Sequence, residues 1–237
     1  KQHEPLVYYD NKHREIYPNV ARSWEISDDG KEFTFYLREG MKWSDGQPFT
    51  TDDIIFWFED IICNEELTPV FPTWLTIGGK RGTVEKIDDY TVRFRFPEPY
   101  GFFIEWIANG QEVHAPKHYL IQFHPKYTPE EKLEEMAKKE GFDFWYQLFM
   151  QKSTWGTPEL PVIWGWETIT QISSSYHIAE RNPYYWKIDP AGDQLPYVDK
   201  WRREIADTEM IIMKAATGQL DWQSGAIWTE FPSYTLL

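Results

Sequence analysis

The sequence predicts a mixed α/β (α+β) protein built of short antiparallel strand pairs and capped helices. Two segments alternate apolar and polar residues on both sides of an Asp-Asp turn, which is the pattern of a β-hairpin. Between them, residues 54–62 place apolar side chains at helical spacing. The chain has 237 residues, 41% of them hydrophobic, so it can bury a core in one large or two modest domains.

The first hairpin is predicted at residues 23–38, where SWEI and FTFYLR flank the turn Asp28-Asp29-Gly30. A second turn at residues 44–46 leads into Thr-Thr-Asp-Asp at 50–53. Hydroxyls can cap the free N–H groups of a helix there, and carboxylates favour its positive end. The sequence therefore predicts a capped helix from about residue 52. Cys63, the only cysteine, falls on its apolar face and is expected to be a buried structural thiol.

Residues 67–82 are rich in Pro, Thr and Gly and predict a loop. A second hairpin follows at 84–96 around an Asp-Asp turn, with Val92, Phe94 and Phe96 on one face. Further helices are expected at 100–108, after Pro116, and from Thr128 as cap to a stop at Gly141. An aromatic helix follows near 142–151.

Residues 155–166 are rich in Pro, Gly and Trp, and we expect a domain boundary there, dividing the chain into 1–155 and 156–237. Beyond it the patterns predict a strand and turn over 172–186, a strand over 197–206, a helix closed near Gly218, and a short strand at 220–224.

The net charge of −14 and a pI near 4.9 argue against nucleic acid or an anionic membrane surface as partners, because both need a basic face. Lys and Arg are scattered among carboxylates. The sequence contains no run of about 20 apolar residues and no secretory signal at its start.

No residue pattern here predicts catalysis, a metal or a cofactor. His114 and His118 are four apart, but Pro116 between them starts the helix, so they do not share a helical face. The glycines at 78–82 lack the Ser/Thr and helix of a phosphate loop, and Ser173–175 lack a nucleophile elbow. The carboxylate pairs have local roles in turns, helix starts and solvated faces. These pairs are Asp28-Asp29, Asp52-Asp53, Asp88-Asp89, Glu130-Glu131 and Glu134-Glu135.

Aromatic residues make up 18% of the chain and include 13 Trp. Large aromatic faces stack on ligands as well as fill cores, so several of these side chains are expected to line a cleft. Those in irregular segments are the better candidates, because a loop offers fewer packing partners.

The phrase ARSWEISDDGKEFTFYLREGMKWSDGQPFTTDDI, within residues 17–55, closely resembles the signature of the family 5 extracellular solute-binding proteins. These are the oligopeptide- and dipeptide-binding components of ABC importers. VEKIDDYTVRFRFPEP, APKHYL, ERNPYYW and AATGQLDW are also similar to family phrases. The resemblance runs from about Tyr17 to about Trp222.

The resemblance implies the type II periplasmic-binding-protein architecture, in which solute is trapped between lobes that close by a hinge. Residues 1–155 would correspond to the small extra domain II, and 156–237 to an incomplete middle segment of domain I. The first part of domain I and all of domain III would be absent. The solute cleft would then be incomplete, and this chain alone would bind solute poorly or not at all.

Two aromatic loops are the expected solute contacts. The loop LTPVFPTW resembles the place where oligopeptide-binding members offer an aromatic side chain, so Phe71 is transferred, although Val70 aligns about as well; Trp74 lies beside it. At the second loop PVIWGWETIT replaces a Gly-Thr-Gly-Pro-Tyr phrase. The indoles there suit sugar rings or apolar side chains. The ligand-binding candidates are Phe71, Trp74, Trp155, Trp164 and Trp166.

The resemblance thus implies an extracytoplasmic solute-binding protein, in the periplasm or as a cell-surface lipoprotein, whose own signal sequence is absent from this chain. It would capture oligopeptides or oligosaccharides, act as a monomer and deliver solute to an ABC permease without catalysis. A carbohydrate-active hydrolase and a non-transport carbohydrate-binding module stay open as alternatives.

Overall fold

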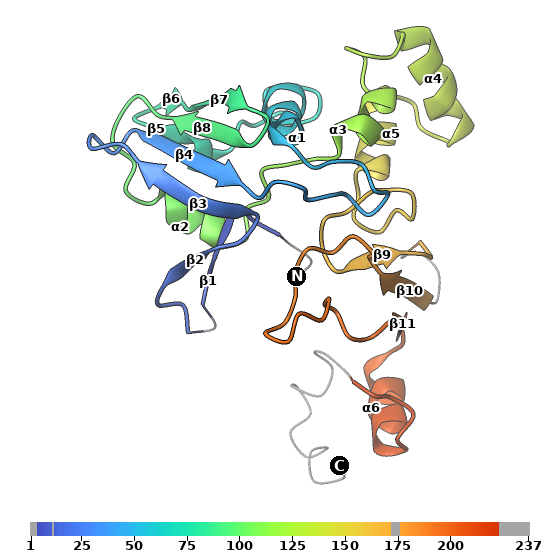
Figure 1. The fold of residues 1–237 in the computed structure, drawn as a ribbon. Coiled ribbons are helices and arrows are strands. Elements are labelled where there is room, and N and C mark those ends of the chain that lie inside the picture. Colours follow the sequence, from blue (N-terminus) through green and yellow to red (C-terminus); the bar gives the residue numbers. More distant parts are fainter. Residues whose placement is uncertain (1–3, 11, 172–175, 223–237) are drawn as a thin grey trace.

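The computed structural model describes residues 4–10, 12–171 and 176–222 (Figure 1). Its largest sheet has four antiparallel strands in the order β3-β4-β8-β7. The two predicted hairpins are confirmed, and they join into one sheet because β4 pairs with β8. The strands are β3 (Ala21–Ile26), β4 (Glu32–Leu37), β7 (Thr83–Asp88) and β8 (Thr91–Arg95).

One face of this sheet forms the centre of the hydrophobic core. Phe103, the first residue of α2 (Phe103–Ala108), packs against it, with ring centroids 4.8 Å from Phe33 and 5.2 Å from Phe94. Val92, Phe94 and Phe96 are all buried, as the alternation predicted. The sheet is therefore covered on this side and has no room there for a ligand.

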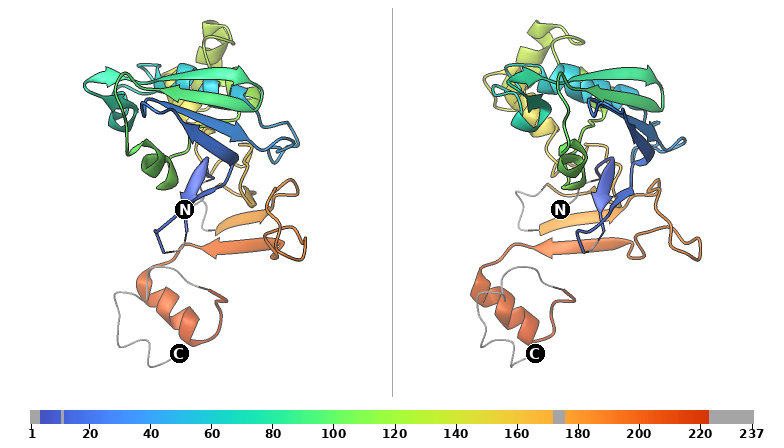
Figure 2. Two further views of the ribbon diagram at one scale, coloured as in Figure 1. Left: turned by 60° about the vertical axis from the view of Figure 1, so that its left-hand side comes forward. Right: turned by 90° about the vertical axis from the view of Figure 1, so that its left-hand side faces the viewer.

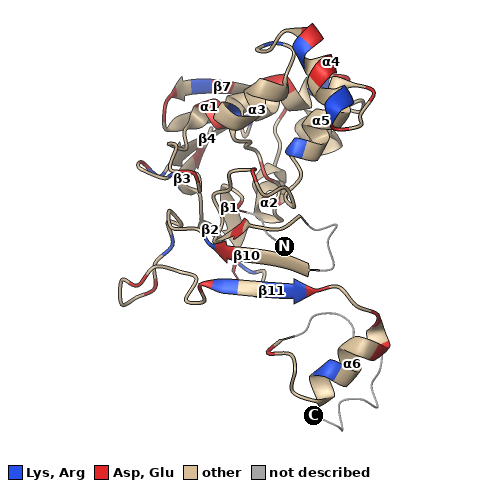
Figure 3. Ribbon diagram, turned by 90° about the vertical axis from the view of Figure 1, so that its right-hand side faces the viewer, with Lys and Arg blue, Asp and Glu red and all other residues tan. Residues whose placement is uncertain are grey.

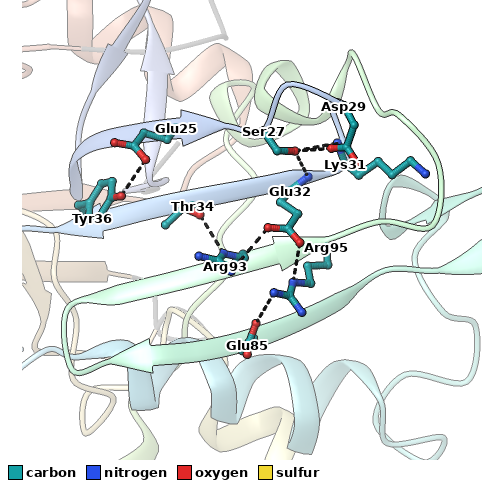
Figure 4. A network of polar contacts seen from close by, with 10 residues as sticks. All are labelled: Glu25, Ser27, Asp29, Lys31, Glu32, Thr34, Tyr36, Glu85, Arg93 and Arg95. Carbon is teal, nitrogen blue, oxygen red and sulfur yellow. Dashed lines mark hydrogen bonds and ion pairs between the residues drawn. The ribbon is translucent and has the colours of Figure 1, made fainter.

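The opposite face carries a ladder of charged side chains (Figure 4). Glu32 pairs with Arg93 at 3.5 Å and with Arg95 at 3.0 Å, and Arg95 also reaches Glu85 at 3.3 Å. All four side chains are 27–46% exposed, so these pairs face water and contribute little each. This face is solvated scaffold.

The predicted helix cap is confirmed at α1 (Thr51–Phe56), where Thr50 and Asp53 form a capping box. The helix then widens into a π-helix, η1 (Trp57–Ile62), which the spacing did not predict. The wider turn carries Cys63 past the buried side, so its thiol is exposed. The expectation of a buried thiol is wrong for that reason.

The predicted loop at 67–82 contains a short 3-10 helix, η2 (Thr73–Leu75), and a small hairpin of β5 (Thr76–Ile77) and β6 (Lys80–Arg81). Gly78 and Gly79 form its two-residue turn with φ of 57° and 74°, which glycine adopts without strain. The glycines are thus turn formers, as expected.

Four helical segments follow between residues 117 and 152, beyond α1 (Figure 1). Thr128 does not cap the charged helix: Pro129 occupies the cap position, and the Thr128 hydroxyl donates to the Ile121 carbonyl at 3.3 Å. The helix ends before Gly141, as predicted, and the φ of Gly141 is 84°. The elements are α3 (Lys117–Leu120), η3 (Ile121–Phe123), α4 (Glu130–Lys139) and α5 (Trp145–Lys152).

A second sheet of three antiparallel strands lies apart from the first, in the order β11-β10-β9 (Figures 1 and 2). Residues 220–222 do not form the expected strand, and 223–224 lie outside the described residues, as do Ser173–175. The predicted boundary at 155/156 falls between the two sheets; the assignment to domains II and I stays a prediction. The elements are β9 (Trp166–Thr168), β10 (Tyr176–Arg181), β11 (Lys200–Glu204) and α6 (Thr208–Ala216).

We call residues 4–152 the N-terminal lobe and residues 155–222 the C-terminal lobe. The hairpin of β1 (Val7–Tyr9) and β2 (Ile16–Pro18), which the sequence did not predict, lies between the two sheets (Figure 2). The turn at 44–46 also joins the lobes. The Ser44 N–H donates to the Val162 carbonyl at 2.8 Å, and the Val162 N–H donates to Ser44 Oγ at 3.2 Å.

Glu4 ties the same junction from the other side. Its carboxylate, 7% exposed, accepts hydrogen bonds from Lys187 at 2.7 Å, Tyr185 at 2.7 Å and Asn19 at 2.8 Å. Lys187 and Tyr185 belong to the C-terminal lobe and Asn19 to the N-terminal lobe. This buried carboxylate therefore connects three distant segments of the chain.

Candidate functional site

The two predicted aromatic loops lie in different lobes, and no aromatic ring contact joins them among the described residues. In the N-terminal lobe, Trp74 stacks on Trp57 at 6.2 Å and on Phe103 at 6.3 Å, both nearly parallel. Phe71 is half-buried, with the Arg81 guanidinium 4.5 Å above its ring. Trp74 is thus packed against the core, and a solute contact at either residue stays a prediction.

In the C-terminal lobe, aromatic side chains gather on one face of the small sheet. Trp166 and Trp201 lie 6.3 Å apart, edge to face. His177 lies 4.8 Å from Trp201 and 5.7 Å from Trp155, again edge to face. We call Trp155, Trp166, Trp201 and His177 the indole cluster.

The strand register explains this cluster. Ala179 in the central strand pairs with Thr168 on one side and with Trp201 on the other, so all three point to the same face. Because Ala179 is small and fully buried, the larger rings of the outer strands meet across it. Trp155 closes the cluster from the preceding loop and stays 45% exposed.

His177 is the polar centre of the cluster. Its side chain is 1% exposed, and its Nε2 lies 3.3 Å from the Thr168 hydroxyl. Its Nδ1 is buried without a hydrogen-bond partner. Burial lowers the pKa of His177, and the nearby Arg203 lowers it further, so the ring is neutral at pH 7. The centre of the cluster is therefore a neutral, buried ring with Arg203 opposite it, and the surface open to stacking is that of the partly exposed indoles.

Trp164 does not join the cluster by any ring contact among the described residues. Its backbone carbonyl accepts from the Asn182 amide at 2.9 Å, and its side chain is half-buried. Sequence reasoning singled out Trp155 and Trp166 but missed Trp201 and His177. The strand register that brings Trp166, His177 and Trp201 together spans residues 166–204, and no local pattern reveals it.

The same sheet brings two carboxylates together on its other face. Glu167 and Glu180 are directly paired across β9 and β10. Burial raises the pKa of Glu167, and the neighbouring Glu180 and Asp45 carboxylates raise it further. Glu180 is also held by Lys200 at 2.7 Å, which neutralises it on an exposed surface. Figure 3 shows the basic residues that lie along β11 on this lobe.

The other polar clusters have local partners. His118 pairs with the Asp45 carboxylate at 2.7 Å, whereas His114 Nε2 forms a hydrogen bond of 3.0 Å with the Glu4 backbone carbonyl. The two histidines thus serve different contacts. Within the part of the chain that the structure describes, no group of three or more His, Cys, Asp or Glu side chains could hold a metal ion.

Asp53 has three donors of its own. Its carboxylate accepts from the Trp43 indole at 3.1 Å and from the backbone N–H groups of Thr50 and Lys117 at 3.0 and 3.1 Å. Burial is the main influence on this carboxyl and raises the pKa of Asp53. The residue joins the start of α1 to α3 and is structural, as the sequence indicated for this pair of aspartates.

Residues 15–235 match the family described as bacterial extracellular solute-binding proteins, family 5 middle. The chain belongs to this family. The resemblance read from the sequence is thereby confirmed. Among the described residues, no helix is long and apolar enough to cross a membrane.

Individual relatives and structures give the same result. A periplasmic alpha-galactoside-binding protein of Rhizobium meliloti is 36% identical over 85% of this chain and 27% of its own length. The structure of an oligopeptide-binding protein, OppA, matches 99% of this chain with a TM-score of 0.92 and 41% identity. That of MelB from Agrobacterium fabrum, in complex with stachyose, matches 92% with a TM-score of 0.73 and 30% identity.

These structures confirm the mixed α/β, periplasmic-binding-protein fold. The chain covers 37% of OppA and 32% of MelB, so it spans about a third of the length of the proteins it matches.

Proposed function

We propose that this chain is part of an extracytoplasmic solute-binding protein of an ABC importer, which captures an oligosaccharide and passes it to a membrane permease. The mechanism is binding, with no bond made or broken. Family membership supports this class, since its named members include periplasmic binding proteins. We further propose that the protein is a monomer, located in the periplasm or anchored at the cell surface.

The indole cluster carries the choice of solute. Trp155 is 45% exposed, and its neighbours Trp166 and Trp201 are partly exposed around the neutral His177. Flat apolar ring faces next to hydrogen-bonding edges bind the C–H faces of sugar rings well. Two relatives in this comparison are named for an α-galactoside or were solved with stachyose, which points the same way.

An oligopeptide is the second candidate solute, because the structure with the highest TM-score quoted above is an oligopeptide-binding protein. A peptide-binding site would need charged side chains for the peptide termini and hydrogen-bonding groups for the peptide backbone. The indole cluster has Arg203 opposite His177, and Arg181, which pairs with Asp199, opposite Trp166; its remaining surface consists of rings. We therefore rank the oligosaccharide first.

Saturation-transfer NMR on the full chain tests this choice, because it detects binding in the millimolar range. We expect stachyose ring protons to receive saturation and a tetra-alanine peptide to receive much less. Trp155→Ala should remove most of the stachyose signal, whereas Trp222→Ala, at a site 81% exposed outside the cluster, should leave it unchanged. Equal signals from Trp155→Ala and the unaltered chain would refute the cluster as the site.

The hydrolase alternative has one concrete place to be tested. Glu167 and Glu180 lie side by side on one exposed face of the sheet, and Lys200 neutralises Glu180, whereas glycoside hydrolysis requires two carboxyl groups that flank the scissile bond. We expect the full chain not to release nitrophenol from nitrophenyl galactosides. Turnover that Glu167→Gln abolishes would reverse this conclusion.

A further inference from the structure

A groove of about 920 Å³ opens at the junction of the two lobes, away from the indole cluster. Its walls come from residues 8–42 of the N-terminal lobe and residues 184–195 of the C-terminal lobe. This volume is in the range of pockets that hold small molecules. The groove is a separate cavity, and the function proposed above does not use it.

The groove carries unbalanced positive charge in a chain whose net charge is −14. Arg38, Lys42 and Lys187 line it against a single carboxylate, Glu39, which pairs with Arg22 at 3.9 Å. Lys187 is paired with Glu4, but among the described residues neither Arg38 nor Lys42 forms an ion pair with a carboxylate. Two cations without an acidic partner, facing one cavity, favour an anionic ligand.

Aromatic rings hold these cations in place. The Arg38 guanidinium lies 5.1 Å from the Trp186 ring centroid, and its Nε donates to the Asn19 carbonyl at 2.7 Å. The Lys42 ammonium lies 5.3 Å from the Tyr184 ring centroid. A cation–π contact positions a charge without neutralising it. The guanidinium therefore keeps unused N–H groups in the planar fork that suits a carboxylate.

Two buried polar atoms on the groove residues have no hydrogen-bond partner. They are the indole Nε1 of Trp186, a donor, and the side-chain Oδ1 of Asn19, an acceptor. Asn19 is 1% exposed and the Trp186 Nε1 atom is also buried, so a small movement of the groove wall is needed before a ligand can reach either atom. A ligand that accepts at the indole and donates to Asn19 would satisfy both atoms.

We propose that this groove binds a sugar acid, a hydroxylated ring that bears a carboxylate. The carboxylate lies at the Arg38 guanidinium, and Lys42 adds positive potential. Hydroxyl groups supply the donor that Asn19 needs and the acceptor that Trp186 needs. Bound there, the ligand contacts both lobes and holds them together.

Calorimetric titration of the full chain at low ionic strength tests the proposal, with D-galacturonate as the probe. D-Galactose has the same ring without the carboxylate, and inorganic phosphate has charge without the ring. We expect galacturonate to bind at least about tenfold more tightly than either, a difference of about 1.4 kcal/mol, and to weaken as salt is added.

Lys42→Met should weaken galacturonate binding at least about fivefold, since it removes one of two unpaired charges and keeps the side-chain stem. Lys132→Met, on the exposed side of α4, is the matched control and should leave binding unchanged. Trp186→Phe keeps the ring but loses the indole donor, and should weaken binding as well. Both groove variants should unfold at the temperature of the unaltered chain.

Three results would overturn the proposal: no binding at millimolar galacturonate, equal binding of galactose, or unchanged affinity in Lys42→Met. If Trp155→Ala abolishes galacturonate binding while Lys42→Met does not, the sugar acid occupies the indole cluster instead. A failure of stachyose to bind, with galacturonate still bound through Lys42, would count against the proposed function alone.

Discussion

Replacing Glu4 by Gln is the sharpest test of how the lobes are joined. The change keeps the shape of the side chain but removes the negative charge beside Lys187, which lies 2.7 Å away. It also places an amide NH₂ among donors, because Tyr185, Asn19 and Lys187 all donate to the present carboxylate. The variant therefore leaves a partly buried ammonium without its partner and disrupts the hydrogen bonds around it.

The exposed fractions set the magnitude. Removing one partner of a fully enclosed ion pair costs about 3–5 kcal/mol. The Glu4 side chain is 7% exposed but that of Lys187 is 28% exposed, so water can solvate part of the freed charge. We expect a loss of about 2–3 kcal/mol in the free energy of unfolding, or roughly 4–10 °C in Tm.

Urea unfolding, followed by circular dichroism and by Trp fluorescence, measures this loss. Glu134→Gln is the matched control: Glu134 and Lys138 form an exposed pair on α4 at 3.4 Å, and its loss should cost less than about 0.5 kcal/mol. If Glu4→Gln is no more destabilising than Glu134→Gln, the buried carboxylate does not hold the junction and the reasoning is refuted.

Three further predictions concern local features. Cys63 is exposed, so a disulfide reagent should label the native chain fully. Partial burial raises the pKa of its thiol, so labelling should be slower than that of free cysteine. Labelling only after unfolding would contradict the structure. Asp53→Ala leaves the Trp43 indole and two backbone N–H groups without their acceptor, and urea unfolding should show a loss of about 2–4 kcal/mol; a loss below about 0.5 kcal/mol would show that water replaces the carboxylate. Burial and Arg203 lower the pKa of His177, so the unfolded state binds the proton more readily, and stability present above about pH 6.5 should fall as the pH drops below it. His177→Gln should flatten this slope between about pH 7 and 5, and an unchanged slope would assign it to other groups.

Local chemistry made much of the N-terminal lobe predictable. The two hairpins follow from alternation around Asp-Asp turns, and the Thr50 cap follows from a hydroxyl placed before two aspartates. Each of these signals lies within about ten residues, and the structure adds only the pairing of β4 with β8.

Features that depend on distant packing were not predictable. The π-helix that exposes Cys63 has the same composition as an α-helix, and Pro129 displaced Thr128 as the cap although either fits the pattern. The hairpin of β1 and β2 gave no signal, because its strands have three residues each.

The candidate sites show the same division. Composition and loop position found Trp155 and Trp166, but only the register across three strands adds Trp201 and His177. The junction groove joins residues 8–42 to residues 184–195, and no single stretch of sequence contains both walls.

The contact between Glu4 and Lys187 also sets an order of events during synthesis. The two residues are 183 positions apart, so at about 5–20 residues per second the carboxylate waits roughly 10 s or more for its partner. Until then Glu4 has no ammonium to neutralise it and no second lobe to enclose it. The hairpins of the four-stranded sheet, by contrast, are complete once residue 95 has emerged. Glu4 is thus made well before the residues that hold it in its final place.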